Sequence, residues 1–285
     1  MSSTKRPFKV IKRGSYLGTD PTMTTTLRRV FASKYNAVLD EGLQQILDQV
    51  VTRDEYNLFY ISKLTFNTRP DAERKLKEFS QWLGTLFSNM FGKIQTGDSL
   101  KEGYFKGMKS VFGMLNRNKL FQKGLNFIEG AFSEFKDRAF KQSTLGLVIE
   151  RVRRDLLGQL NRLQSNLERE FANLLSSGMS QKDFKKALTG LFQKAKDSAV
   201  ILTGDGIIRA YNEGSLDGMD ALGIRIVSLE VELVTAGDEN VCTVCEDAAG
   251  KYTLEEARGL LPIHPRCRCR FIPELDELPP GEQSQ

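Results

Sequence analysis

The residue types best suited to bind a metal or to act as nucleophiles are confined to one short part of this chain. All four cysteines and the only histidine among the 285 residues lie between Cys242 and Cys269, a window of 28 residues. Five residues scattered independently would rarely gather in about a tenth of a sequence, so their spacing is informative as a ligand pattern.

These five residues form two pairs and one extra thiol. Cys242 and Cys245 are spaced C-x2-C, His264 and Cys267 are spaced H-x2-C, and 18 residues separate the pairs. Each spacing places two ligand atoms on one tight turn, and a hairpin or short helix between the pairs can bring the turns together. Thiolate and imidazole ligands suit Zn²⁺, so we predict one zinc ion held by these four side chains in a closed tetrahedral site.

Cys269 is the alternative to Cys267 as the fourth ligand. It follows Cys267 by two residues, so an extended backbone would point both thiols to the same side. Two other interpretations stay open for the cluster, namely a redox-active C-x-x-C pair and buried thiols without a ligand.

The composition of the cluster argues against catalysis. A catalytic zinc keeps one position open for water, whereas here the protein can fill all four positions and has a thiol to spare. The chain holds no second histidine to serve as a base or to build a nucleophilic triad. We therefore predict a structural zinc ion that stabilises a small β segment, in a protein that is not an enzyme.

The hydrophobic pattern changes its period just before the first ligand pair. Before residue 223, apolar residues recur every three to four positions, which predicts a mainly α fold of long amphipathic helices. Over 224–234 apolar and polar residues alternate, which predicts a half-exposed strand followed by a turn at 235–240. The expected fold is thus a set of long helices with a small, zinc-stapled, β-containing C-terminal segment.

Helix boundaries follow from capping residues. Asp20-Pro21 would open the first helix, which runs to Val51, because Asp caps free N–H groups and Pro suits the first helical position. Ser180 and Asp183 form a capping pattern for a later helix. The predicted helices are 21–51, 70–91, 143–177, 181–201 and 204–222.

Residues 101–142 have an unusual composition. They contain eight aromatic residues, nine Lys or Arg against four Asp or Glu, and five glycines, and we predict short helices with close contacts or bends at the glycines. Their Phe residues are expected to form core or subunit-contact surface. Base stacking and an interfacial membrane helix are the alternatives.

Charge is uneven along the chain. The formal net charge is only +5, which does not by itself indicate a nucleic-acid-binding protein, but residues 1–20 form a basic arm and residues 274–285 an acidic tail that we expect to be disordered. The arm is either solvated or follows phosphates or an acidic partner. The weak candidates for nucleic-acid or partner contact are Lys5, Arg6, Lys9, Lys12, Arg13, Arg266, Arg268 and Arg270.

The last three of these arginines alternate around Cys267 and Cys269. They would present a basic ridge to a partner, or be solvated or paired with Glu230, Glu232 or Asp247. No run of about 20 apolar residues is present, so we expect no membrane span.

The C-terminal motif resembles a known family. The stretch from Val231 to Cys245 (VELVTAGDENVCTVC), then Ala249-Gly250, then Leu261 to Cys269 (LPIHPRCRC) and Pro273 are similar to the closing motif of the phage head morphogenesis family, the Mu F-like minor capsid proteins of tailed phages. In that family pattern the first Cys after His-Pro is the steadier one, which favours Cys267. Leu233 departs from a frequent Trp, and Thr203-Gly204-Asp205 departs from a common Thr-Glu pair.

The resemblance implies a function and a division of the chain. It implies a minor head protein inside the capsid near the portal vertex, present in host cytoplasm during assembly, that aids procapsid assembly and DNA packaging or delivery. Its expected partners are the portal protein, a scaffolding or major capsid protein, and packaged double-stranded DNA. The alternative is a zinc-stabilised DNA-binding protein, and a metal-dependent nuclease is a distant third. The expected regions are a 1–20 arm, a helical 21–142 region, a head-morphogenesis-like domain over 143–273 (helices 143–222, zinc-bearing segment 223–273) and the 274–285 tail.

Overall fold

The computed structural model describes residues 24–50, 69–94, 96–116, 144–177, 179–221 and 230–273. Contacts divide the chain into two compact units. The helical unit is Thr26–Glu102 with Leu145–Ile207, and the cysteine unit is Met1–Thr25, Gly103–Thr144 and Ile208–Gln285. This division differs from the chain-order division expected above, which stays a prediction.

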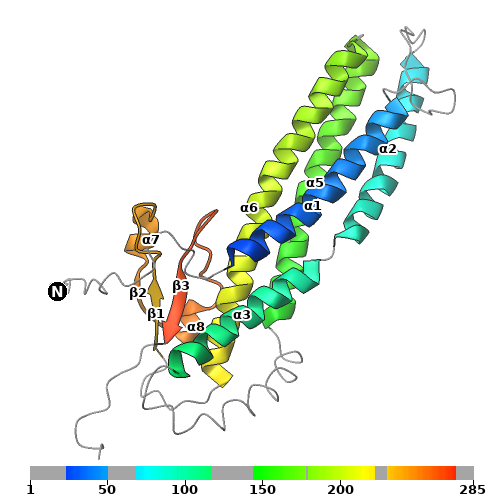
Figure 1. The fold of residues 1–285 in the computed structure, drawn as a ribbon. Coiled ribbons are helices and arrows are strands. Elements are labelled where there is room, and N and C mark those ends of the chain that lie inside the picture. The colour runs from blue at the N-terminus through cyan, green and yellow to red at the C-terminus, as the bar shows by residue number, and fades with distance from the viewer. Residues whose placement is uncertain are drawn as a thin grey trace, which may run out of the picture. The chain divides into compact units, whose positions relative to one another are not determined.

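The described residues are mainly helical, as predicted, with short strands near the C-terminal end (Figure 1). The predicted helix 70–91 is observed as a slightly longer helix, and the predicted 143–177 helix is observed almost unchanged. The elements are α1 (Thr25–Val50), α2 (Arg69–Lys93), α3 (Thr96–Asn116), α5 (Thr144–Ser177), α6 (Gln181–Ala221), β1 (Glu230–Val234), α7 (Thr243–Asp247), β2 (Gly250–Thr253), α8 (Leu254–Ala257) and β3 (Arg270–Pro273).

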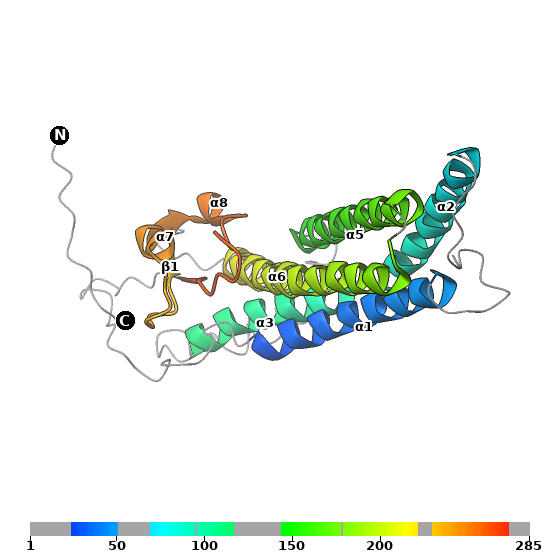
Figure 2. The ribbon, with the colours of Figure 1, turned by 90° about the horizontal axis from the view of Figure 1, so that it is seen from above.

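In the helical unit, long helices lie lengthwise against each other. Both views show α5 beside the part of α6 that belongs to this unit (Figures 1 and 2). Phe79 of α2 stacks on Phe171 of α5 with ring centroids 3.9 Å apart, and Phe184 of α6 lies 6.2 Å from Phe171. All three rings are fully buried, so the apolar stripes predicted from periodicity do form a core.

α6 is one helix of 41 residues, which corrects the predicted break between 201 and 204. The Thr203 hydroxyl donates to the Ala199 carbonyl at 2.7 Å, so its side chain bonds within the helix rather than ending it. Gly206 fits because Val152 and Leu100 pack closely against it, and a Cβ there would lie 2.9 Å from Val152. Tertiary packing therefore outweighs the low helix propensity of this Gly-containing stretch. The predicted cap is confirmed at the start of the helix, where the Asp183 N–H donates to the Ser180 hydroxyl at 3.1 Å.

α3 is also continuous, so over 101–116 the predicted division into short helices is wrong, and of the two alternatives predicted at the glycines a bend is not found at Gly103, Gly107 or Gly113. Within the cysteine unit, Gly107 lets α3 approach α6 closely, since a Cβ there would lie 1.8 Å from the Tyr211 carbonyl oxygen. Gly214 of α6 makes the reciprocal contact with the Tyr104 carbonyl, at 2.0 Å. These glycines permit backbone contact rather than a bend. Residues 117–142 lie outside the described residues.

α1 begins at Thr25, after the buried and non-helical Thr24. The predicted start at Asp20-Pro21 lies outside the described residues. Thr is itself a favourable residue before a helix, and three threonines stand at 24–26, which explains a start later than the Asp-Pro pattern indicates.

The cysteine unit contains a three-stranded antiparallel sheet in the order β2-β1-β3. Val231 pairs with Tyr252 of β2, and Leu233 pairs with Phe271 of β3. Along β1 burial alternates, with Val231 and Leu233 buried, which confirms the predicted period of two for the described part of that strand. Val231, Leu233 and Phe271 belong to one apolar cluster, together with Leu216 and Met219 of α6.

No helix in the described parts of the chain combines the length and apolar character needed to cross a membrane.

Candidate metal centre

The first ligand pair lies on a turn that opens α7. Cys242 precedes the helix with an extended backbone, and Cys245 lies in its first turn. The Cys245 N–H donates to the Cys242 carbonyl at 3.0 Å, which closes the turn. Cys245 is buried and Cys242 is partly exposed, so the pair lies at the edge of the buried part of the unit.

The second pair lies on a turn of the same kind. The Cys267 N–H donates to the His264 carbonyl at 3.1 Å. Arg266 completes the turn with a φ of 64°, in the left-handed region that non-glycine residues rarely adopt. Two similar turns therefore present the four predicted ligands.

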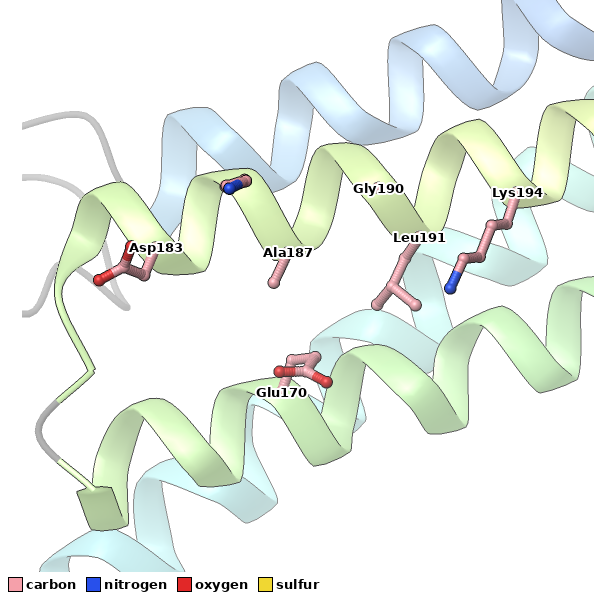
Figure 3. Close-up of a pocket in the computed structure, with 7 residues that line it drawn as sticks. Glu170, Asp183, Ala187, Gly190, Leu191 and Lys194 are labelled. Atoms are coloured by element: carbon pink, nitrogen blue, oxygen red, sulfur yellow. The ribbon is translucent and has the colours of Figure 1, made fainter.

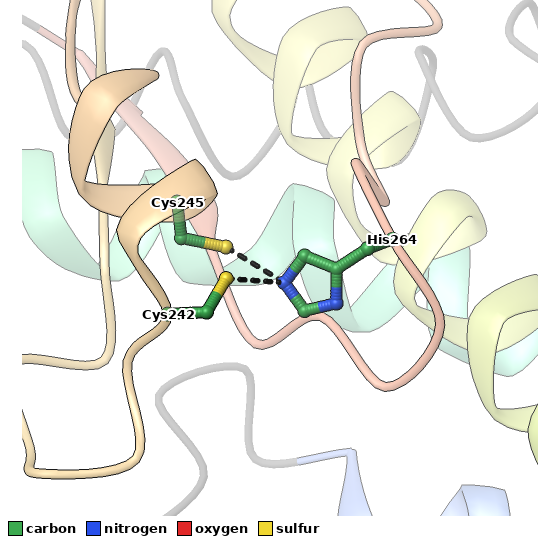
Figure 4. A group of neighbouring side chains, drawn as sticks. All are labelled: Cys242, Cys245 and His264. Carbon is green, nitrogen blue, oxygen red and sulfur yellow. Dashed lines mark hydrogen bonds between the residues drawn. The ribbon is translucent and has the colours of Figure 1, made fainter.

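The two turns converge through His264 (Figure 4). Its Nε2 lies 3.2 Å from Cys242 Sγ and 2.9 Å from Cys245 Sγ, while Cys245 Sγ lies 3.9 Å from Cys267 Sγ. Two sulfurs bound to one tetrahedral zinc ion are separated by about 3.8 Å, so the Cys245–Cys267 spacing already fits. The imidazole would withdraw by a few tenths of an ångström to admit the ion.

The second nitrogen of His264 supports a metal-binding role. Nδ1 lies 2.8 Å from the Pro265 carbonyl oxygen, which is a hydrogen-bond acceptor only. This contact keeps the proton on Nδ1 and leaves the lone pair of Nε2 facing the two sulfurs. Metal-binding histidines in proteins are held in this way by a partner of the other ring nitrogen.

The five candidate ligands fall into two overlapping groups. Cys242, Cys245 and His264 have their ligand atoms within 4.8 Å of one another, and so do Cys245, Cys267 and Cys269. Cys245 is common to both groups. The cluster can thus hold a metal. Cys242, Cys245 and His264 form what we call the outer group of donors, and Cys267 or Cys269 can add a further sulfur.

Hydrogen bonding distinguishes the last two cysteines. The Cys269 thiol donates to the Cys267 sulfur, and chiefly for this reason the pKa of Cys267 is lowered to about 5 while the pKa of Cys269 is raised. Burial raises the pKa of Cys245 to about 12, and the backbone N–H of Cys245 lowers the pKa of Cys242. The hydrogen bond from Nδ1 to the Pro265 carbonyl raises the pKa of His264.

Asn212 of α6 connects the helix to the ligand segment. Its Nδ2 donates to the Cys269 carbonyl at 3.3 Å, and its Oδ1 accepts from the Phe271 N–H at 3.1 Å. The side chain is almost fully buried. It satisfies both backbone groups at the start of β3 and so fixes the strand that follows Cys267 and Cys269. Sequence reasoning did not single out this role.

The three arginines around the cysteines differ in their surroundings. Arg268 makes a two-pronged ion pair with Asp238, with Nη1 at 2.5 Å and Nη2 at 2.6 Å from its carboxylate oxygens. The Arg268 guanidinium lowers the pKa of Asp238. Local pairing was expected as one alternative, but with Glu230, Glu232 or Asp247 rather than with the turn residue Asp238. Arg266 is exposed and Arg270 is half-buried in β3.

The other predicted contact residues lie outside the described residues. They are the arm residues Lys5, Arg6, Lys9, Lys12 and Arg13.

A partly buried polar network lies near α8, and the sequence did not predict it. Asp217 of α6 accepts from the Tyr104 hydroxyl at 2.5 Å, from the Thr144 hydroxyl and from Arg258 Nη1 at 2.6 Å. Glu213 accepts from the Gly259 N–H at 2.8 Å, and burial raises its pKa. The i, i+4 spacing of Glu213 and Asp217 was the one sequence signal that could have indicated it.

A separate hollow of 410 Å³ lies between α5 and α6 in the helical unit (Figure 3). Its lining contains two acidic residues, Glu170 and Asp183, and two basic residues, Lys186 and Lys194. The other lining residues are Ala187, Gly190 and Leu191. The lining includes none of the residues singled out as ligands, and its charges balance.

In comparisons with protein-family models, curated proteins and solved structures, nothing matches this chain. A functional conclusion therefore depends on the metal centre and on the motif that surrounds it.

Proposed function

We propose that this chain is a minor head protein of a tailed phage, and that a structural zinc ion holds its C-terminal segment together. The observation that supports it best is the convergence of Cys242, Cys245 and His264, with Cys267 Sγ 3.9 Å from Cys245 Sγ. These residues occupy the positions of the motif that resembles the Mu F-like family.

Donor chemistry supports zinc as the ion. The set would be three sulfurs and one imidazole nitrogen, which is among the common sets of structural zinc sites. With Cys242, Cys245, His264 and Cys267 bound, no position remains for water. The bound ion would then link the turn at α7 to the turn before β3, and its binding free energy would add to the folding free energy.

The surroundings of the cluster support a structural role. Cys245, Cys267 and Cys269 belong to the apolar cluster that includes Leu233 and Phe271. β2 and β3 have only four residues each, so the sheet buries little apolar surface by itself. A segment as short as Glu230–Pro273, with so small a sheet, commonly needs a metal to reach full stability.

A head-assembly role is tested by co-expression with the portal protein encoded in the same genome. A complex that survives about 0.5 M salt would support the proposal, because at that ionic strength surface charge pairs are strongly screened. The chain should also be found by mass spectrometry in purified virions. Absence from virions and from portal complexes would overturn the assembly role.

A zinc-stabilised DNA-binding protein is the second candidate, favoured by the five Lys or Arg residues of the 1–20 arm. Its affinity for DNA would fall steeply with salt and would not require a portal protein. Metal-dependent cleavage of DNA that disappears in His264→Ala would instead indicate a nuclease.

A further inference from the structure

The geometry points to a second metal position in the cysteine unit, formed by Cys245, Cys267 and Cys269, which binds a soft monovalent cation of the Cu⁺ class with three sulfurs. This position is distinct from the four-ligand zinc site proposed above, although it shares two of its sulfurs. It does not depend on the role of the protein in phage assembly.

The three sulfurs are already arranged for a three-coordinate ion. All three lie within 4.8 Å of one another, and the Cys245–Cys267 distance is 3.9 Å. An ion about 2.3 Å from each of three sulfurs in a plane separates them by about 4 Å. Little movement of the side chains would be needed.

The surroundings of the three sulfurs favour a soft metal ion. Cys245, Cys267 and Cys269 are 3%, 0% and 2% exposed, and they are packed in the apolar cluster with Leu216 and Phe271. A dry, all-sulfur site favours Cu⁺ over cations that prefer oxygen or retain water. The outer group contrasts with it, since it includes an imidazole nitrogen and the partly exposed Cys242.

Residues outside the three-sulfur position hold its cysteines in place. Asn212 bonds the carbonyl of Cys269 and the N–H of Phe271, and the Arg268–Asp238 pair fixes the residue between the two cysteines. Three thiolates around one Cu⁺ ion leave two negative charges on the complex, and each sulfur that is still protonated releases its proton on binding. Arg266 and Arg270 flank this segment in the sequence and add positive charge near it, whereas the charge of Arg268 is already paired with Asp238.

The sharing of Cys245 and Cys267 has a consequence for occupancy. The zinc site needs both sulfurs, and so does the three-sulfur position. One chain therefore binds either Zn²⁺ or Cu⁺ with its full ligand set, and Cu⁺ added to the zinc-loaded chain should release one zinc ion for each copper ion bound.

The test measures both affinities on the full chain without oxygen, with Cu⁺ in competition with a colorimetric Cu⁺ chelator and Zn²⁺ with a fluorescent indicator. We expect Cys269→Ser to weaken Cu⁺ at least tenfold and Zn²⁺ less than threefold. Cys242→Ser should do the reverse, because Cys242 belongs only to the outer group. Equal weakening of Cu⁺ by both variants, or unchanged Cu⁺ affinity in Cys269→Ser, would overturn the proposal.

His264→Ala provides a measurement that does not require Cys269 to be replaced. This variant keeps all three sulfurs, so it should retain its Cu⁺ affinity and its stabilisation against heat by Cu⁺, while stabilisation by Zn²⁺ should be smaller than in the wild type because one of the four zinc ligands is removed. Loss of Cu⁺ binding in His264→Ala would overturn the three-sulfur position. Retention of zinc in a copper-loaded chain would do so as well. Both results are obtained without reference to portal binding, so they are separate from failure of the head-assembly role.

Discussion

At the residue scale, the ligand turns share one geometry. In each, the N–H of the second ligand residue donates to the carbonyl of the first, Cys245 to Cys242 and Cys267 to His264. The bond fixes the separation of the two ligand atoms before any ion binds. His264 is fixed further by the contact of Nδ1 with the Pro265 carbonyl, which leaves Nε2 to the metal.

We predict one Zn²⁺ per chain and unequal effects of cysteine replacement. Cys242→Ser and Cys267→Ser should each weaken zinc binding at least about tenfold, because each removes one of four ligands. Cys269→Ser should have a mild effect, since serine keeps a hydroxyl that can donate to the Cys267 sulfur. Titration of zinc with an indicator measures these affinities. If Cys267→Ser kept its zinc affinity and Cys269→Ser lost it, Cys269 rather than Cys267 would be the fourth zinc ligand.

Glu213 is expected to make folding stability depend on pH. Burial raises its pKa in the folded protein, so its contribution to stability is complete below the pKa of the unfolded chain and is lost as pH rises through the folded value. Glu213→Gln keeps an oxygen that can accept from the Gly259 N–H and removes the charge. It should therefore gain stability relative to the wild type as pH rises from about 4 to 7.

Urea unfolding of the zinc-loaded proteins at several pH values measures this difference. Asp220→Asn is the matched control, because the Asp220 side chain is 64% exposed and also faces Arg258. The pH profile of the control should follow that of the wild type. A Glu213→Gln variant that loses stability relative to the wild type as pH rises would contradict the argument.

Spacing predicted the ligands, but not the residues that hold them. C-x2-C and H-x2-C are local patterns, and local hydrogen bonds produce the turns. Asn212, by contrast, contacts the Cys269 carbonyl 57 residues further along the chain, and Arg258 meets Asp217 41 residues away. Such partners depend on how α6 packs on the ligand segment, and no pattern near either residue reveals them.

At the element scale, α3 and α6 are held together in the cysteine unit by backbone contact. Tyr104 and Gly107 of α3 face Gly214 and Tyr211 of α6, each glycine against the carbonyl of the opposite tyrosine. Close approach of this kind leaves no room for even one methyl group. The Tyr211 hydroxyl also donates to the Ser110 hydroxyl at 2.8 Å, which adds a polar link between the same helices.

Gly107→Ala should destabilise the protein by about 2–3 kcal/mol, because the new Cβ would lie 1.8 Å from the Tyr211 carbonyl oxygen and the helices must separate. Gly113→Ala lies on the same helix with nothing within 4 Å of its Cβ, and should be neutral or stabilise by up to about 1 kcal/mol. Thermal unfolding of both variants checks this. Similar values for the two would show that α3 and α6 do not touch in this way.

Periodicity predicted the long helices well and their interruptions poorly. The apolar stripe of α5 is buried as expected, from Leu145 to Leu174. A break was predicted before Gly204 in α6, and either a close contact or a bend at the glycines of α3, since glycine lowers helix propensity. The structural role of each glycine depends on the residue that packs against it, as Val152 does at Gly206. That neighbour cannot be inferred from the residues of one helix alone.

At the scale of the whole molecule, the basic arm is predicted to add a salt-sensitive interaction. Deletion of residues 1–19 removes Lys5, Arg6, Lys9, Lys12 and Arg13 and no acidic residue. If the arm follows DNA phosphates, the slope of log affinity against log salt should fall by about 4, while thermal stability stays nearly unchanged. Deletion of the acidic residues 274–285 is the control and should not weaken binding. An arm deletion that unfolds the protein would show that the arm is structural.

The central claim is that the protein itself closes the coordination shell of a zinc ion. X-ray absorption at the zinc edge of the purified, zinc-loaded full chain tests this most directly. The predicted result is three sulfurs at about 2.3 Å and one nitrogen at about 2.0 Å, with no oxygen ligand. Two sulfurs with a bound oxygen would contradict the claim, because an open position on the ion is the arrangement used for hydrolysis.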